Sequence, residues 1–214
     1  PRFPHAAPDT FEPAVAVSFL RETIRSRPGE ITLLAVGPMT NVGLLFALDR
    51  EIPSLLKRLV LMCGDFGGQT TPGRYAEWNS QCDPDASALV YGARGVEHLS
   101  VGLNVTMKCR MPAAEAIARF RAIGGPLDVV AAATEIWGRK RDMVVFHDPL
   151  AAAVIFEPGL IETGRCLVQV ERHSSLVAGL TCWRPRAEET PHTVAMRVDA
   201  PRFLEHYFAV VGAR

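Results

Sequence analysis

The segment from Glu77 to Asn79 combines an acid, an indole and an amide, residue types that suit binding of a polyol beside an apolar ring. Side chains two positions apart on an extended backbone point the same way, so Glu77 and Asn79 would offer acceptors and a donor together. Trp78 would then pack on the apolar ring. The alternative interpretation is structural: Asn79 is a turn residue, Glu77 lies in solvent and Trp78 belongs to the core.

His147 and Asp148 follow the apolar run 143–146, which we expect to be buried, and they precede Pro149. A histidine here suits a general acid, and an aspartate beside it suits a ligand of a cation. The alternative is a helix start, with the aspartate as N-cap and the proline at the first helical position. The spacing leaves both interpretations open. The remaining histidines stand alone and are expected to be surface or hydrogen-bonded residues: His5, His98, His173, His192 and His206.

Residues 37–41, Gly-Pro-Met-Thr-Asn, form a third segment of interest. Their backbone carbonyl groups, that of Thr40 included, could face a hard cation, which prefers oxygen ligands. A tight strand-to-helix turn capped by Thr40 or Asn41 explains the same residues. The glycine-rich stretch 64–73 matches neither G-x-G-x-x-G nor G-x-x-x-x-G-K-[ST], which argues against a nucleotide-phosphate loop. G-x-S-x-G and H-E-x-x-H motifs do not occur either.

A scaffold must bring these segments together, and alternating strand-like and helical stretches predict an α/β fold. Strands are expected at 31–36, 59–62, 99–103, 167–171 and 193–198, the first of them buried on both faces. Helices are expected from Pro13 to about 27, at 42–49, 112–123 and 127–139, and from Pro84, His147 and Asp199 onward. Ligands of open α/β sheets bind at the carboxyl ends of the strands. We therefore expect residues 1–214 to form one domain, a mostly parallel open sheet flanked by helices, with a Rossmann-like arrangement.

The composition argues against several kinds of partner. The 214 residues carry 23 Lys+Arg and 23 Asp+Glu, so the formal net charge is zero, which disfavours nucleic acid and anionic membrane surfaces. The apolar runs are far shorter than the roughly 20 residues that span a bilayer. The five cysteines form no C-x-x-C pair, and the first residues lack the apolar core of a signal peptide. Both features favour a cytoplasmic protein with reduced thiols.

Taken in order, four segments resemble the inosine-uridine preferring nucleoside hydrolase family. Residues 35–41 are similar to its A-x-G-P-L-T-N turn and residues 59–64 to its V-x-M-G-G strand end. Residues 76–86 are similar to its A-E-F-N followed by D-P-E-A, and residues 146–151 match its H-D-P-L-A. Each motif alone is weak, whereas the four in this order are specific. Weaker similarity runs from about residue 10 to the C-terminus.

The resemblance implies hydrolysis of the N-glycosidic bond of a ribonucleoside, giving ribose and a free purine or pyrimidine base, as in base salvage. It implies that Ca²⁺ holds the ribose hydroxyl groups and a water, with Asp148 and the backbone carbonyl of Thr40 among its ligands. His147 would lie near the leaving base as its acid or hydrogen-bond partner. A homodimer or homotetramer is also implied. The residues implied around the ribose are Met62, Glu77, Trp78 and Asn79.

The sequence departs from the family pattern at several positions. The family's D-x-D-x-x-x-D-D cluster, which supplies most calcium ligands and the general base, does not occur in these 214 residues, and we expect it before residue 1. The family's Gly-Asn before A-E-F-N is unmatched, and Cys63 replaces a glycine. Asn104 and Met107 depart from its D-V-T-H. If the natural protein began at Pro1, we would expect a non-catalytic scaffold or ligand-binding relative without the metal site.

Four polar or aromatic residues shortly before His147 are expected to face the leaving base, because the family's base contacts precede its H-D-P. The alternative is a solvated helix end with basic residues near its C-terminus. The four residues are Glu135, Trp137, Arg139 and Arg141.

Overall fold

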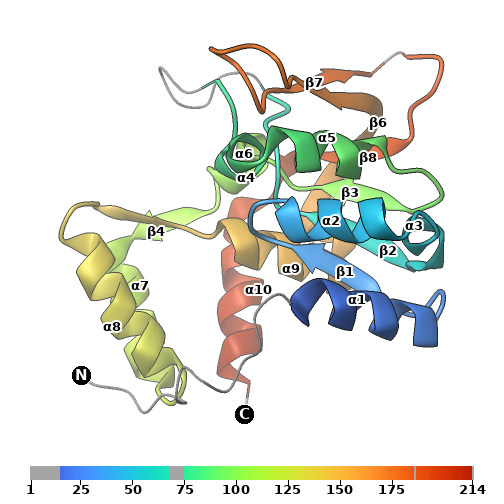
Figure 1. Cartoon of the computed structure of the whole chain (residues 1–214). Helices are drawn as coiled ribbons and strands as arrows, with labels where there is room; N and C mark the ends of the chain where they lie inside the picture. Colours follow the sequence, from blue (N-terminus) through green and yellow to red (C-terminus); the bar gives the residue numbers. More distant parts are fainter. Residues whose placement is uncertain (1–14, 68–74, 186, 214) are drawn as a thin grey trace.

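A six-stranded sheet forms the centre of the structure, a computed structural model that describes residues 15–67, 75–185 and 187–213 (Figure 1). The strands are Thr32–Ala35 (β1), Arg58–Leu61 (β2), His98–Ser100 (β3), Ile161–Val170 (β6), Thr181–Arg184 (β7) and His192–Val198 (β8). Their order is β1-β2-β3-β8-β6-β7. β1, β2, β3 and β8 are parallel, and β6 runs antiparallel to its neighbours β8 and β7. The predicted mostly parallel open sheet is therefore confirmed.

The helices follow the predicted alternation with the strands. They are Val15–Ser26 (α1), Thr40–Leu48 (α2), Ile52–Leu55 (α3), Trp78–Cys82 (α4), Pro84–Gly92 (α5), Leu103–Thr106 (α6), Ala113–Ile123 (α7), Leu127–Gly138 (α8), His147–Phe156 (α9) and Ala200–Gly212 (α10). The side chain of Asp83 caps α5 and that of Asp199 caps α10, each accepting from a backbone N–H three residues on. Pro13, expected at the start of the first helix, and part of the glycine-rich stretch 64–73 lie outside the described residues.

Alternate residues of the central strands enter two separate cores. Val60 and Met62 belong to the core under α9 and α10, whereas Leu59, Leu61 and Cys63 belong to the core under α1, α2 and α5. This is the period of two that an extended strand imposes. β2 is thus buried on both faces, as a strand inside a parallel sheet must be.

Two local expectations are wrong. Every residue of β1 is only half-buried, because β1 is the outermost strand of the sheet in the described part of the chain. The strand expected at 99–103 ends at Ser100, and Leu103 already begins α6. The run of apolar residues in the sequence does not show where a strand stops pairing and a helix begins.

A helical hairpin, α7 and α8, stands apart from the sheet (Figure 1). Its base is a short antiparallel ribbon of Arg110–Pro112 (β4) with Met143–Val145 (β5), which the sequence does not predict. Aromatic rings join the hairpin to α9 and α10: Phe120, Phe146, Phe203, Tyr207 and Phe208. Phe146 contacts Phe120 and three rings of α10 and is 2% exposed, so the cluster fixes the chain directly before α9.

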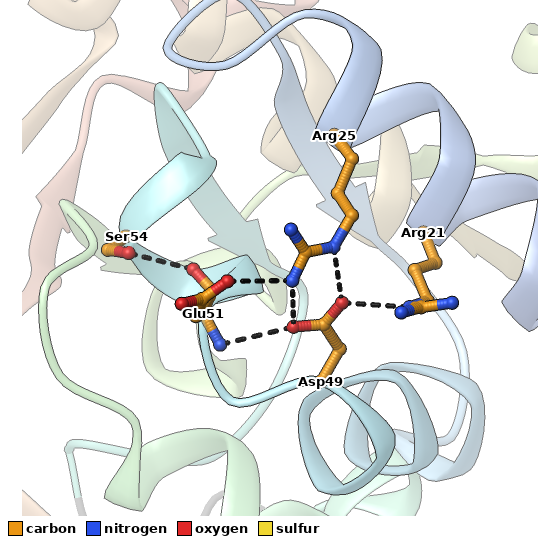
Figure 2. A network of polar contacts seen from close by, with 5 residues as sticks. All are labelled: Arg21, Arg25, Asp49, Glu51 and Ser54. Atoms are coloured by element: carbon orange, nitrogen blue, oxygen red, sulfur yellow. Dashed lines mark hydrogen bonds and ion pairs between the residues drawn. The ribbon is translucent and has the colours of Figure 1, made fainter.

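A polar network ties α1 to the end of α2 (Figure 2). Asp49 follows the last turn of α2 and accepts from Arg25 Nε at 2.6 Å, from Arg25 Nη2 at 2.8 Å and from Arg21 Nε at 2.8 Å. Arg25 Nη2 also donates to Glu51 at 2.8 Å. The hydrogen bonds from Arg25 and then Arg21 hold the pKa of Asp49 well below its usual range. The two guanidinium groups thereby offset a negative charge at a helix C-terminus, where the dipole disfavours it.

Two of the isolated histidines lie side by side inside the sheet. His98 and His192 are register partners on β3 and β8, and their ring centroids are 4.9 Å apart. His192 accepts from Val168 N and donates to Tyr91 O, so its expected hydrogen bonding is confirmed. His98 Nε2 lies 3.4 Å from Ser100 Oγ, a hydrogen bond, whereas its Nδ1 is buried without a hydrogen-bond partner among the described residues. Burial, and then His192, lower the pKa of His98 to about 3, which keeps this ring neutral.

The cysteines are free thiols, as expected: Cys63, Cys109 and Cys166 are buried, and Cys82 and Cys182 are exposed. No described helix has the length and apolar character needed to cross a membrane.

Candidate active site

A cavity of about 720 Å³ opens at the carboxyl end of β2, between α4, α8 and the start of α9. Met62 directly follows β2, and its N–H donates to Ala35 O at the end of β1. The ends of neighbouring parallel strands therefore lie level, which brings loops that are distant in sequence to one edge. One wall is polar and is formed by Met62, Asp65, Glu77, Asn79, His147 and Asp148.

Glu77 is a buried cap of α4, only 4% exposed. Its Oε1 accepts from Asn79 N at 2.8 Å, and its Oε2 accepts from Ser80 N at 3.1 Å and from Gly64 N at 3.2 Å. Burial raises the pKa of Glu77, although these N–H groups favour its charged form. The interpretation that places Glu77 in solvent is wrong, because Gly64, thirteen residues earlier, draws the carboxylate inward.

Asn79 and Trp78 also depart from the structural alternative. Asn79 lies inside α4 and is buried, and its Nδ2 donates to Met62 O at 2.9 Å, which links α4 to the end of β2. Its amide is thus oriented by the strand end. Trp78 is 58% exposed and lines the cavity, so it does not belong to the core.

The hairpin between β6 and β7 contacts both segments of the polar wall. The buried Thr181 hydroxyl accepts from Asp65 N at 3.0 Å and donates to Asp65 O at 3.4 Å. Gly179 has a φ of +87° and lies so close to α4 that a Cβ there would be 2.5 Å from Gln81 Cα. The hairpin thus fixes the loop after β2 and the end of α4 together.

His147 and Asp148 are the first two residues of α9. The N-cap position is held by Phe146, so the interpretation of Asp148 as the N-cap is wrong and its carboxylate is exposed at the cavity. The run 143–146 before them is half-buried except for the buried Phe146, which corrects the expectation of a fully buried run. His147 Nδ1 lies 2.7 Å from Thr106 Oγ1. Burial lowers the pKa of His147 and raises that of Asp148.

Thr40 lies apart from this group. It is exposed at the start of α2, its hydroxyl donates to Asp83 Oδ2 at 2.7 Å, and it does not line the cavity. Neither Thr40 nor Asn41 caps α2, because Met39 holds the N-cap position without a side-chain hydrogen bond. The turn at 37–41 is therefore held by its backbone and by the contact to Asp83.

The described residues do not by themselves form a calcium site. Nowhere in the ranges that the structure describes do three or more His, Cys, Asp or Glu side chains gather so that they could hold a metal ion. Asp148 with one backbone carbonyl falls short of the about six to eight oxygen ligands that Ca²⁺ takes. The chemistry of the donor set among the described residues thus does not fit the ion.

The opposite wall of the cavity is apolar and comes mainly from α8. Val130, Ala133, Thr134 and Trp137 line it at helical spacing, so they share one face of α8. The Thr134 hydroxyl donates to Val130 O within the helix, so this hydroxyl is already hydrogen-bonded. Half of the Trp137 side chain is exposed, and the Arg141 guanidinium lies 4.0 Å from its ring centroid.

Of the four residues expected at a leaving base, the structure brings two to the cavity. Trp137 and Arg141 line it, whereas Arg139 does not, and Glu135 pairs with Arg121 of α7. Sequence reasoning overlooked the α8 stripe, although its i, i+3, i+4, i+7 spacing is readable. It also overlooked Asp65, which lies in the loop after β2 and lines the cavity.

The two walls suit different halves of a ligand. Acceptors and amide groups on one side can bind hydroxyl groups, and an apolar wall with an indole and a guanidinium can hold a planar heterocycle. The cavity volume lies within the range of about 300–1,000 Å³ that is usual for small-molecule sites.

Comparison with known proteins adds independent findings. The profile of the inosine-uridine preferring nucleoside hydrolase family matches residues 3–205. The pyrimidine-specific ribonucleoside hydrolase RihA of Salmonella arizonae is 35% identical over 177 residues, which cover 78% of this chain and 55% of that protein. RihA of Escherichia coli O1:K1 is 33% identical over 212 residues, covering 92% of this chain and 66% of that protein. The chain thus spans about half the length of the first of these relatives and two thirds of the second.

Solved structures show the same fold. A plant nucleoside hydrolase, PpNRh1, superposes with a TM-score of 0.82 at 22% identity, covering 99% of this chain and 70% of that one. The inosine-uridine preferring nucleoside hydrolase of Bacillus anthracis gives a TM-score of 0.75 at 26% identity, covering 92% of this chain and 64% of that one.

Proposed function

The chain belongs to the inosine-uridine preferring nucleoside hydrolase family, and we propose that it hydrolyses the N-glycosidic bond of ribonucleosides to ribose and a free base. The observation that carries the proposal is the two-sided cavity, with hydrogen-bonding groups on one wall and the α8 stripe on the other. A nucleoside has the same division between a polyol and a flat ring. A nucleoside is uncharged, which agrees with the zero net charge of this chain.

In this proposal the ribose lies against Met62, Glu77, Trp78 and Asn79. Glu77 Oε2 already accepts two backbone N–H bonds, whereas Oε1 accepts one and has a second acceptor direction, so Oε1 can accept from a ribose hydroxyl. Asn79 keeps its carbonyl oxygen for the same purpose, since its Nδ2 is used by Met62 O. Both side chains are held before the substrate arrives, which lowers the entropic cost of binding.

The chemical step that we propose is attack of water at the anomeric carbon with departure of the base. The C–N bond breaks, its electron pair goes to the base nitrogen, and the water oxygen forms the new bond to carbon. The water loses one proton to solvent and the base nitrogen takes one up, so the products are ribose and the neutral base. The transition state is oxocarbenium-like, and the oxygen atoms around the ribose stabilise its charge. Burial keeps the His147 pKa low, so at neutral pH the ring is a neutral hydrogen-bond partner for the base.

The leaving base would lie against α8, with Trp137 stacking on it and Arg141 at its edge. The curated relatives named above are pyrimidine-specific, and the same specificity is a hypothesis for this chain. Ca²⁺ assistance in the whole protein stays a prediction from the family resemblance, which implies Asp148 and the Thr40 carbonyl as ligands, because the described donors alone are too few for this ion. A homodimer or homotetramer and a cytoplasmic location remain predictions from the family resemblance.

The test is ribose release from inosine, uridine and cytidine by the full-length protein, with Ca²⁺ and after chelation. The proposal is supported if ribose release is lost in His147→Ala but kept in Glu205→Gln, a control at an exposed residue outside the cavity. No release from any ribonucleoside at saturating Ca²⁺ would refute it.

A second candidate function is nucleoside binding without catalysis. The observation in its favour is the lack of a metal-binding group among the described residues. It predicts that calorimetry detects inosine or uridine binding while no ribose is released, and that chelation leaves this binding unchanged.

A further inference from the structure

Thr106 and His147 form a close contact between two elements that are far apart in sequence. Thr106 is the last residue of α6 and is fully buried, and His147 opens α9, forty-one residues later. The Thr106 Oγ1 lies 2.7 Å from His147 Nδ1. His147 lines the cavity and Thr106 does not, so Nε2 is the ring nitrogen left for a ligand.

The surroundings of the hydroxyl decide which atom donates. Within the described residues His147 is the one side-chain or backbone partner found for Thr106 Oγ1. If Nδ1–H donated to the hydroxyl, the hydroxyl proton would be buried without an acceptor, and native proteins avoid this arrangement. Donation from the Thr106 O–H to Nδ1 satisfies both atoms. In a neutral imidazole, an accepting Nδ1 places the proton on Nε2.

Thr106 is held by a rigid support. Asn104, two residues earlier, donates from Nδ2 to Ala195 O on β8 at 2.8 Å and accepts from Phe66 N at 3.4 Å. The backbone of Thr106 also accepts from Cys109 N at 3.0 Å. The hydroxyl therefore cannot follow a rotation of the imidazole, and the ring must adjust to it.

We propose that Thr106 is a positioning residue that fixes His147 as the Nε2–H tautomer and turns this N–H toward the leaving base. The N–H then donates a hydrogen bond to a ring nitrogen or carbonyl oxygen of the base as negative charge develops there. The role toward the base rests on the proposed hydrolase function. The tautomer itself does not, so the two parts are tested separately.

The tautomer is measured by ¹⁵N NMR of the full-length protein with ¹⁵N-labelled histidine. The spectra are recorded at pH 8, where the neutral ring prevails. The His147 signals are identified by their loss in His147→Gln. The proposal expects a protonated Nε2 and an accepting Nδ1 in the wild-type protein. Thr106→Val removes the donor at nearly constant volume and should give a mixture of tautomers. Thr106→Ser keeps the hydroxyl and should restore the wild-type signals. Thr193→Val removes a threonine hydroxyl from β8, away from the cavity, and should change nothing.

The role toward the base is read by comparing two leaving groups. With inosine or uridine we expect kcat of Thr106→Val to fall about 10- to 100-fold and to recover in Thr106→Ser. This is less than the roughly 10²–10⁴-fold effect of a whole general acid, because His147 itself remains. With 4-nitrophenyl riboside, whose phenolate departs without help, kcat should change less than about twofold. A purely structural role of Thr106 would lower both rates alike, which would overturn the proposal.

A wild-type ring protonated at Nδ1 would overturn the assignment without any variant, even if Thr106→Val did not fold. Unchanged tautomers in Thr106→Val would overturn it as well. If the wild-type protein released no ribose, the proposed function would fail, while the NMR result would still decide whether Thr106 sets the tautomer.

Discussion

Replacing Gly179 by alanine tests whether the β6–β7 hairpin supports the polar wall of the cavity. Gly179 adopts a φ of +87°, and a Cβ added there would lie 2.5 Å from the Cα and 2.8 Å from the N of Gln81. These are backbone atoms of α4, which cannot turn away as a flexible side chain could. The hairpin or α4 must therefore shift, and α4 carries Glu77 at its N-cap and Asn79 in its first turn.

The two costs can be added. A positive φ costs a residue with a Cβ about 1–2 kcal/mol, and forcing a methyl group into a packed contact costs about 1–3 kcal/mol. We expect Gly179→Ala to lower the free energy of unfolding by about 3 kcal/mol, which for a chain of this length lowers Tm by about 6–12 °C. Gly29→Ala is the matched control, because Gly29 has a φ of +77° but nothing lies within 4 Å of the added Cβ. Its Tm should fall by only about 2–8 °C.

Thermal unfolding followed by circular dichroism measures both variants side by side, and KM for a ribonucleoside reports on α4. Gly179→Ala should raise KM, since the groups that contact the ribose move, whereas Gly29→Ala should leave KM unchanged. Equal losses of Tm in the two variants would refute the reasoning, because they would show that the contact between Gly179 and Gln81 carries no cost.

Three further predictions concern other parts of the molecule. Burial lowers the pKa of His98 to about 3, below the ordinary 6.5, so the unfolded chain binds a proton at a higher pH than the folded chain does. The free energy of unfolding therefore falls by about 1.4 kcal/mol per pH unit as pH drops from 6.5 toward 3. Denaturant unfolding at pH 7, 6 and 5 should show that this free energy falls less steeply in His98→Gln. Trp137→Ala should raise KM for nucleosides about tenfold by removing a stacking surface, while Ile136→Ala, on the same helix outside the cavity, should not. Asp49→Asn should lower Tm at pH 7 and speed amide hydrogen exchange of α1, since Arg25 loses its ion pair with the Asp49 carboxylate. Unchanged exchange would contradict the network in Figure 2.

Local sequence signals predict the helix starts at Asp83 and Asp199, because an aspartate cap depends on residues within one turn. The same Asp-Pro pattern misleads at Asp148. There the N-cap is Phe146, two residues earlier, since Phe146 is fixed by aromatic rings of α7 and α10. Whether an aspartate caps a helix or faces a cavity is thus decided by packing partners that are distant in sequence.

The candidate site shows the same limit. Motif resemblance selects Glu77, Asn79 and His147, but the depth of Glu77 depends on the N–H of Gly64, and the orientation of His147 depends on Thr106. The ribbon of β4 and β5 escapes prediction because strands of three residues carry no readable alternation.

The place of β8 in the sheet has a consequence for how the molecule forms. β8 is the last described strand along the chain, yet it lies between β3 and β6. Asp65 and Thr181 are 116 residues apart, and Asn104 and Ala195 are 91 apart, so the contacts that shape the cavity close very long loops. Contacts of such separation form slowly. During synthesis the edge of β3 stays open until β8 arrives, and an open edge pairs readily with other chains. The pocket is therefore completed only late in folding, and a chain halted before residue 192 would have an aggregation-prone edge in place of a site.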